Sequence, residues 1–158
     1  MDQKQNPVAG YTLTIPGEMS PHRLTIPGRL PGLNEYTSAC RSNHMAGAAM
    51  KQESQDIVLW AIRSKMRQVH FEKPVFLLFT FYERDRRRDR DNVASYARKV
   101  IQDALVKAGT LEDDGWDHVT GYLDAFKIDS KNPRIVVEFI EQEVTPKCSK
   151  QQSKSSKK

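Results

Sequence analysis

The spacing of apolar residues changes along the chain, and the first half predicts one strand, one loop and one helix. Residues 24–27 form a short apolar segment that predicts a strand, and the Pro- and Gly-rich residues 27–36 predict a loop. Residues 45–69 predict a helix, because apolar residues recur on one side of it. That side consists of Met50, Ile57, Trp60, Ala61 and Met66. Trp60 is therefore expected in the core.

The second half opens with the two strongest patterns in the sequence. Residues 74–83, PVFLLFTFYE, are apolar and aromatic throughout, which is typical of a buried central strand. Apolar residues then recur at helical spacing, which predicts an amphipathic helix that ends at Gly109. Its apolar positions are Val93, Ala97, Val100, Ile101, Ala104, Leu105 and Ala108.

Two more strands are predicted at residues 118–128 and 134–144. The turn-rich sequence DSKNP between them indicates an antiparallel hairpin. The whole order is β-α-β-α-β-β, with two main helices. This order predicts the α+β class, as a single domain around one mixed β-sheet.

The ends of the chain have a different composition from the middle. Residues 1–20 are expected to form a flexible N-terminal extension, and residues 145–158 a disordered tail rich in Lys and Ser. The folded domain is then expected to cover residues 21–144.

The sequence LTIPG occurs twice, at residues 13–17 and 24–28. Two copies are too few for a repeat protein. Either the first copy is an additional strand-like segment, or the functional domain starts near Met19 rather than at Met1. The second interpretation is favoured.

The positive charge of the protein is concentrated in its last residues. The sequence has 25 Lys and Arg against 20 Asp and Glu, a net charge of +5 at pH 7. The five lysines of residues 145–158 account for this excess, so residues 1–144 are balanced. A basic surface over the whole domain is not expected, but a local basic cluster at 84–90 is. The tail is expected either to contact phosphates or only to aid solubility.

The composition also excludes several classes of protein. With 38% hydrophobic and 28% charged residues and no long apolar segment, the chain is expected to be a soluble cytoplasmic protein that does not enter a membrane. Cys40 and Cys148 stand outside any Cys-x-x-Cys pattern, so neither a disulfide framework nor a cysteine zinc site is expected. The histidines lack the spacing of metal ligands, and Cys40 with His44 is only half a site.

The segment RDRRRDRDN, residues 84–92, carries the candidate chemistry, and it has a structural interpretation. Asp91 or Asn92 would cap the following helix, and Asp89 would add a favourable charge near the helix N-terminus. The other charges would form a solvated loop of weak ion pairs. This interpretation does not explain why five arginines accompany the acids. They are Arg84, Arg86, Arg87, Arg88 and Arg90.

The functional interpretation of the same segment is a metal and phosphate site. The Asp-x-Asp pair of Asp89 and Asp91, at the end of a buried strand, places two carboxylates on a rigid support. Mg²⁺ takes oxygen ligands of this kind and keeps waters for substrate phosphates. Arginines bind a phosphodiester backbone through their fork of donors. Acids for a metal and bases for a polyanion are what a nuclease requires.

Two later features bear on this hypothesis. Asp91, Ser95 and Lys99 fall within a stripe ~80° wide on the predicted helix, so Lys99 is either a phosphate contact or an ordinary exposed lysine. The sequence LEDDGW then supplies Asp113 and Asp114, although Asp-Gly is also a turn signal. Only the strand after this turn could bring Asp114 back to the first acids.

The sequence RRRDRDN, followed by K..QDALVKAG and LEDDGW, resembles the RusA family of Holliday junction resolvases, endonucleases of bacteria and their phages. TIPGRLPGLNEY at residues 25–36 is similar to that family's opening strand and Asn-containing loop. The resemblance covers residues 24–143 and is most specific between Arg86 and Trp116. It implies a RusA-like fold.

The resemblance also implies roles for individual residues. Asp89, Asp91 and Asp114 would be the catalytic metal-binding carboxylates, with Asp113 a weaker candidate. Lys99 would be the catalytic lysine when counted back from DALVKAG, whereas Ser95 occupies that place when counted forward from DN. The arginines that would bind DNA are Arg86, Arg87, Arg88 and Arg90.

The activity that follows is paired, metal-dependent hydrolysis of phosphodiesters in four-way DNA junctions, in recombination or repair and in a phage or prophage setting. The resemblance implies Mg²⁺, with Mn²⁺ as an alternative, and a homodimer. No small-molecule cofactor is expected. The alternatives are a nuclease for flaps or forks, a non-catalytic DNA-binding module, and an interaction protein that works through its Lys tail. Trp116, beside the acidic turn, is assigned either to a subunit contact or to DNA stacking.

Overall fold

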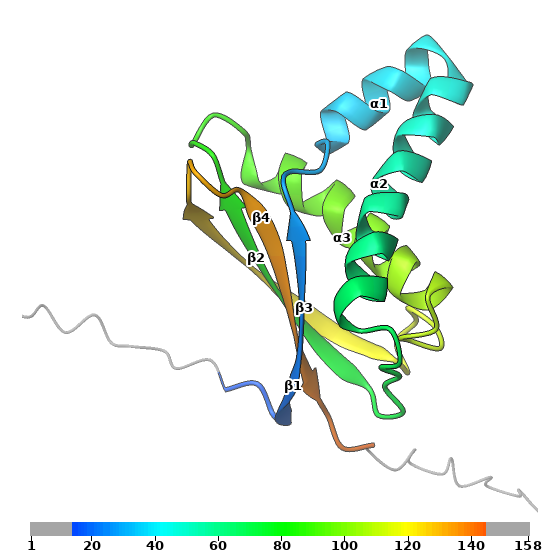
Figure 1. Ribbon diagram of the computed structural model, residues 1–158, viewed down its shortest axis with the longest axis vertical. Coiled ribbons are helices and arrows are strands. Elements are labelled where there is room, and N and C mark those ends of the chain that lie inside the picture. Colours follow the sequence, from blue (N-terminus) through cyan, green and yellow to red (C-terminus); the bar gives the residue numbers. More distant parts are fainter. Residues whose placement is uncertain (1–13, 145–158) are drawn as a thin grey trace, which may run out of the picture.

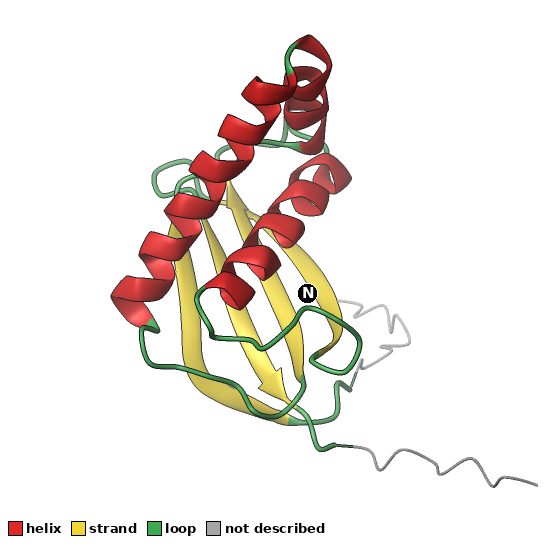
Figure 2. Cartoon of the chain, turned by 90° about the vertical axis from the view of Figure 1, so that its right-hand side faces the viewer, coloured by secondary structure: helices red, strands yellow, loops and turns green. Residues whose placement is uncertain are grey.

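The computed structural model describes residues 14–144 as three helices on a four-stranded sheet. The first half consists of β1 (Glu18–Pro27), α1 (Leu33–Ser42) and α2 (His44–Lys65). The second half consists of β2 (Val75–Glu83), α3 (Arg90–Lys107), β3 (Val119–Ile128) and β4 (Arg134–Glu141). The helices lie on the same side of the sheet, and α2 and α3 run alongside each other over it (Figures 1 and 2). The predicted α+β class and the single mixed sheet are confirmed.

The strand order is β1-β4-β2-β3, and β2 is a central strand, as predicted. Alternate residues of β2, from Val75 to Phe81, face the helices and are buried. They form the core together with Ile135, Val137 and Phe139 of β4 and the apolar side of α3.

The predicted hairpin is wrong. β4 pairs antiparallel with both β1 and β2, whereas β3 pairs parallel with β2 on its other side. The apolar β2 therefore separates β3 from β4, and residues 129–133 pass across its end, where the Asp129 amide donates to the Glu83 carbonyl at 2.8 Å. The turn residues signalled a change of direction correctly, but they do not determine which strands pair. β2, α3 and β3 instead form a parallel strand–helix–strand unit.

The predicted loop at 27–36 is partly wrong, because α1 begins at Leu33. Gly32 precedes this helix, and Tyr36 packs its ring 5.1 Å from that of Tyr96 on α3. α1 has no fully buried residue and few apolar side chains, and Pro and Gly residues run up to its first residue, so the sequence pattern is that of a loop. The domain therefore has three helices rather than two main ones.

The predicted apolar side of α2 is also partly wrong. The buried positions include Val58, Leu59 and Ile62, whereas the Trp60 side chain is 63% exposed. Trp60 is therefore not part of the core. The helix ends at Lys65 instead of Val69, with Met66 as its C-cap. For α3 the prediction is confirmed over its buried positions, and Gly109, at φ +78°, follows the end of the helix.

The N-terminal boundary lies earlier than predicted. β1 begins at Glu18, so the last residues of the expected extension are in the sheet, where Met19 pairs with Ile140. Pro16, in the first LTIPG copy, is not in a strand, although its carbonyl accepts a hydrogen bond from Gln142 at 3.0 Å. The expected tail at 145–158 and residues 1–13 lie outside the described residues. Within residues 14–144, no helix is long and apolar enough to cross a membrane.

Candidate functional site

The candidate site is built around the corner between β2 and α3. Asp89 is the N-cap of α3, and its Oδ2 accepts a hydrogen bond from the backbone N–H of Asn92 at 3.2 Å. The cap predicted at Asp91 or Asn92 is therefore wrong by two or three positions. Asp91 is exposed in the first helical turn, where the helix dipole favours a negative charge.

Asn92 stabilises α1 rather than α3. Its Oδ1 accepts a hydrogen bond from the Asn34 amide at 2.7 Å, in the first turn of α1. A Cβ atom at Gly32 would come within 2.4 Å of the Asn92 side chain, so the glycine permits this close approach. The Pro- and Gly-rich segment before α1 is thus attached to the start of α3, and it positions the β2–α3 corner.

The arginines of the corner divide into one buried anchor and several exposed side chains. Arg88 is only 15% exposed, and it donates to the Leu30 carbonyl at 2.7 Å and to Glu83 at 3.4 Å. Arg29 lies 3.6 Å from the same Glu83 carboxylate, which is itself buried. The structure therefore gives Arg88 a role in holding the corner together, which the sequence pattern did not reveal.

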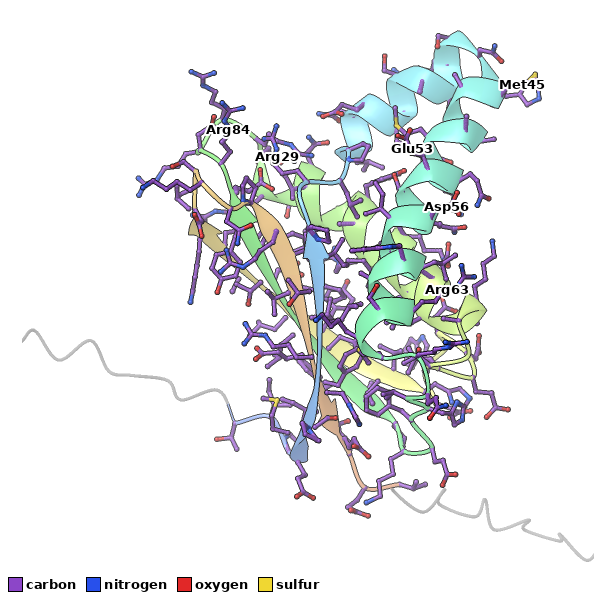
Figure 3. The ribbon with its side chains drawn as sticks, in the orientation of Figure 1. Arg29, Met45, Glu53, Asp56, Arg63 and Arg84 are labelled. Atoms are coloured by element: carbon purple, nitrogen blue, oxygen red, sulfur yellow. The ribbon has the colours of Figure 1, made fainter. Side chains whose placement is uncertain are left out.

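Arg86, Arg87 and Arg90 are exposed, as a role in DNA binding requires. Arg84 also extends from the corner, at the same end of the molecule as Arg29 (Figure 3). The Arg90 guanidinium lies 5.7 Å from the centre of the Phe126 ring of β3, close enough for a cation–π contact.

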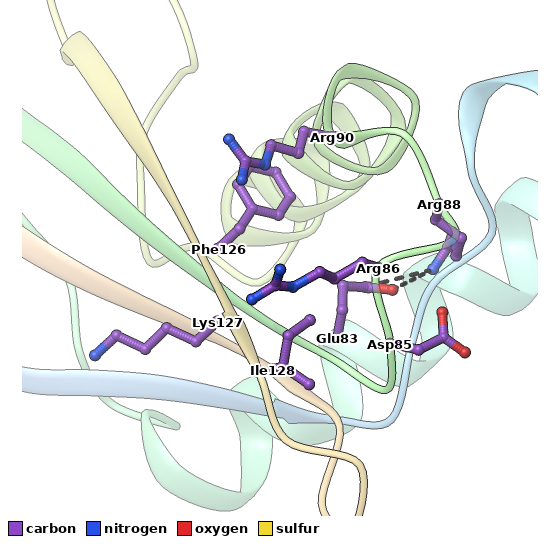
Figure 4. Close-up of a pocket in the computed structure, with 8 residues that line it drawn as sticks. All are labelled: Glu83, Asp85, Arg86, Arg88, Arg90, Phe126, Lys127 and Ile128. Carbon is purple, nitrogen blue, oxygen red and sulfur yellow. Dashed lines mark hydrogen bonds and ion pairs between the residues drawn. The ribbon is translucent and has the colours of Figure 1, made fainter.

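A cavity of about 560 Å³ opens beside these side chains, between the corner and the end of β3 (Figure 4). It is lined by four cationic side chains, two carboxylates and two apolar residues: Arg86, Arg88, Arg90, Lys127, Glu83, Asp85, Phe126 and Ile128. Arg88 points to Glu83 rather than into the open space, as the dashed contacts in Figure 4 show. The balance of charge suits an anion such as a phosphodiester.

Lys99 lies between two carboxylates, farther along α3. Its ammonium donates to Asp114 at 3.0 Å and contacts Asp103 at 2.8 Å, and Asp103 also contacts Lys51 at 3.2 Å. The hydrogen bond to Asp103, followed by that to Asp114, raises the pKa of Lys99. The Lys99 hydrogen bond in turn lowers the pKa of Asp114. Ser95, the alternative to Lys99, is half-buried one turn nearer the helix start.

The predicted aspartates lie at two levels along the axis of α3. Asp91 precedes Lys99 by eight residues, which is ~12 Å along the helix axis, and Asp114 lies at the level of Lys99. Within residues 14–144 there is no group of three or more Asp, Glu, His or Cys close enough to hold a metal ion. The structure therefore brings Lys99 and Asp114 together, but it does not gather Asp89, Asp91 and Asp114 into one cluster.

A further carboxylate, which the sequence pattern did not single out, lies between α3 and β3. Asp124 forms an ion pair with Arg98 through Oδ2, while its Oδ1 is buried without a hydrogen-bond partner. Burial raises the pKa of Asp124, against the lowering effect of Arg98, and the negative charge of Asp91 raises it further. The Arg98 guanidinium also lies 4.2 Å from the centre of the Tyr122 ring.

Two sequence signals could have identified this pair. Arg98 follows Asp91 by seven residues, two helical turns, so both lie on one side of α3. Tyr122, Asp124 and Phe126 alternate along a strand and therefore face the same way.

Among residues 14–144, Asp91 and Asp124 are two carboxylates that a divalent cation could use. Mg²⁺ needs only one or two carboxylates and completes its shell with water and phosphate oxygens. Asp91 and Asp124 offer two carboxylates that interact electrostatically, and one oxygen of Asp124 is unsatisfied. Asp89 and Asp114 already have partners, the Asn92 amide and Lys99 respectively.

The remaining candidates are less informative. Trp116, beside Asp114, is 96% exposed, and the two roles assigned to it stay open. Cys40 is a free thiol, and Cys148 lies outside the described residues. His70 Nδ1 lies 2.7 Å from the Gly109 carbonyl, in keeping with a structural contact.

In comparisons with known proteins, no family model matches the chain and no curated protein matches it. The resemblance to the RusA family therefore stays a prediction, based on the motifs of the sequence.

Proposed function

We propose that the protein is a metal-dependent endonuclease that hydrolyses phosphodiesters in branched DNA, with four-way junctions as its substrate. The observation that carries the proposal is the position of exposed carboxylates beside a cation-lined cavity, at the corner where β2, β3 and α3 meet. Arg86, Arg87 and Arg90 would bind phosphates on either side of the scissile bond. The RusA-like motifs of the sequence support the choice of substrate.

The metal that the resemblance implies is Mg²⁺ or Mn²⁺ held by Asp89, Asp91 and Asp114, although the described residues do not bring these three carboxylates together. When bound, such an ion activates water and neutralises charge that develops on the phosphate. The resemblance implies that Lys99, which contacts Asp114 and Asp103 in the metal-free protein, would stabilise that charge. Arg88 would act indirectly by fixing the corner through Glu83 and the Leu30 carbonyl.

The resemblance also supports a homodimer as the active form. Two equivalent sites related by a two-fold axis could nick opposed strands of a junction. Light scattering of the protein in solution tests this part of the proposal separately. A monomer that cuts one strand at a time would favour flaps or forks as the substrate.

The alternative is a DNA-binding module without catalysis, and two observations favour it. Asp89 is occupied as a helix cap, and the three predicted aspartates are not gathered. In that case the arginines bind the backbone while the acids only stabilise the fold.

The deciding experiment incubates the protein with a labelled four-way junction and with the matching linear duplex, in Mg²⁺ and in EDTA. Asp91→Asn is the test variant, because it removes one charge and keeps the shape of an exposed side chain. Glu143→Gln is the matched control, since Glu143 is exposed near the opposite end of the sheet. We expect metal-dependent nicks in the junction only, lost in Asp91→Asn and retained in the control. Binding without cutting in either Mg²⁺ or Mn²⁺ would refute the nuclease.

A further inference from the structure

Asp124 is a carboxylate that the proposed site does not use. One of its oxygens is buried without a hydrogen-bond partner among the described residues. Its side chain is 19% exposed, its Oδ2 pairs with Arg98, and its Oδ1 has no hydrogen-bond partner. A buried carboxylate with an unsatisfied oxygen is costly to a folded protein. Tyr122 and Phe126, two residues to either side on the same face of β3, both make cation–π contacts with arginines of α3.

The register between α3 and β3 places Asp124 beside the first half of α3, in which Asp91 lies. Arg90 lies over Phe126, and Arg98 reaches Tyr122 and Asp124, so the helix runs along β3 in the opposite direction to the strand. Asp91 follows Arg90 directly and shares one side of the helix with Arg98. Its charge acts on Asp124, in agreement with this register.

We propose that Asp124 is a metal ligand of the same site, paired with Asp91 across the α3–β3 interface, and that Arg98 holds its carboxylate in the metal-free protein. This inference rests on the proposed function and changes the composition of its site. A divalent cation would take the Asp124 oxygens in place of the Arg98 guanidinium. Arg98 already lies against the Tyr122 ring, which would keep the released guanidinium in place.

This assignment avoids a difficulty with the predicted ligands Asp89 and Asp114, which already have other partners. Asp89 uses one oxygen as a helix cap and Asp114 is bound to Lys99, whereas Asp124, although paired with Arg98, keeps one oxygen without a hydrogen-bond partner within residues 14–144. Asp91 and Asp124 together supply the two carboxylates that Mg²⁺ commonly takes from a protein. Arg90 and Phe126, the sequence neighbours of Asp91 and Asp124 on the same elements, line the cavity in which the arginines would hold phosphates.

The test measures where Mn²⁺ binds, independently of cleavage. Substoichiometric Mn²⁺ broadens the NMR signals of amides near the ion, and a titration gives its affinity. The main variant is the double substitution Asp124→Asn with Arg98→Gln, which leaves the net charge unchanged. The matched control is Lys73→Gln with Glu143→Gln, which removes an exposed ion pair of 2.9 Å near the other end of β2. Thermal unfolding shows that each variant is folded.

In the wild-type protein we expect broadening around residues 91 and 124. The double variant at the α3–β3 interface should lose Mn²⁺ affinity by at least about tenfold, and the control should keep it. The single variant Arg98→Gln should bind Mn²⁺ more tightly than wild type, because it removes a competing cation. An ion pair far from the metal would not produce this gain, and the loss of affinity in the double variant separates a ligand role of Asp124 from the effect of charge alone.

Broadening that centres on Asp114, or that survives unchanged in the double variant, would overturn the inference and leave a metal-dependent nuclease intact. Failure of the wild-type protein to bind Mn²⁺ at any site would instead refute the metal dependence of the proposed nuclease. The two proposals therefore fail on different observations.

Discussion

Removing the Arg88 side chain should destabilise the fold, in contrast to removing its exposed neighbours. Arg88 donates to the Leu30 carbonyl at 2.7 Å and to the buried Glu83 carboxylate at 3.4 Å. Loss of one partner of a buried ion pair typically costs ~3–5 kcal/mol, because the other charge stays buried. Arg29, 3.6 Å from Glu83, would compensate in part, so we expect Arg88→Met to cost about 2–3 kcal/mol.

The measurement is the free energy of unfolding from urea titrations, together with the melting temperature. For a domain of this size the expected loss corresponds to a fall of ~4–12 °C. Arg86→Met is the control, because Arg86 is exposed and should change stability by less than ~0.5 kcal/mol. Adding Glu83→Gln to Arg88→Met should recover part of the loss, since no unpaired charge stays buried. If Arg88→Met were as stable as Arg86→Met, the anchoring role of Arg88 would be refuted.

Three further predictions concern the caps, the loops and the arginines. Asp89→Ala should lower the free energy of unfolding by ~1 kcal/mol, because the helix loses its cap. Asp89→Asn can still cap the helix and should keep most of the stability. If Asp89 is a metal ligand, Asp89→Asn should nevertheless lose metal-dependent cleavage. The hydrogen bond from Arg134 lowers the pKa of Asp129. The Asp129 carboxylate therefore stabilises the fold at a pH above its ordinary pKa, and this stabilisation is lost as the pH falls through the lowered pKa. Arg134→Gln should move the NMR titration midpoint of Asp129 upward. Removing Arg86 or Arg87 should each reduce the slope of log affinity for DNA against log salt by about 1, as filter binding at several salt concentrations would show; an unchanged slope would mean that the arginine does not contact phosphate.

The sequence was most informative where one pattern determined one element. Continuous apolar character predicted β2, and helical periodicity predicted α3, because each of these elements packs against the core along its whole length. α1 was missed for the opposite reason, since no residue in it is fully buried. The pairing of β3 with β2 was missed because strand pairing depends on the docking of α3, which no local sequence shows.

The candidate site was predicted only in part for a similar reason. Asp89, Asp91 and the arginines are contiguous in sequence, so a short motif reveals them. The burial of Arg88 depends on Leu30 and Glu83, and the role of Asp124 depends on Arg98, so these contacts become visible only in three dimensions. Lys99 was proposed from its helical position, and its contact with Asp114 was found only in the structure.

The position of β3 at the edge of the sheet has a consequence for local stability. β3 is hydrogen-bonded to β2 alone, while β2 and β4 each have neighbours on both sides. Edge strands with few buried side chains open more readily than central ones, without unfolding of the whole domain. Amide hydrogens of β3 should therefore exchange with solvent sooner than those of β2 and β4. Because Asp124 is on β3 and Asp91 on α3, each opening would separate the two carboxylates, and ligands that bridge them should slow the exchange of this strand above all others.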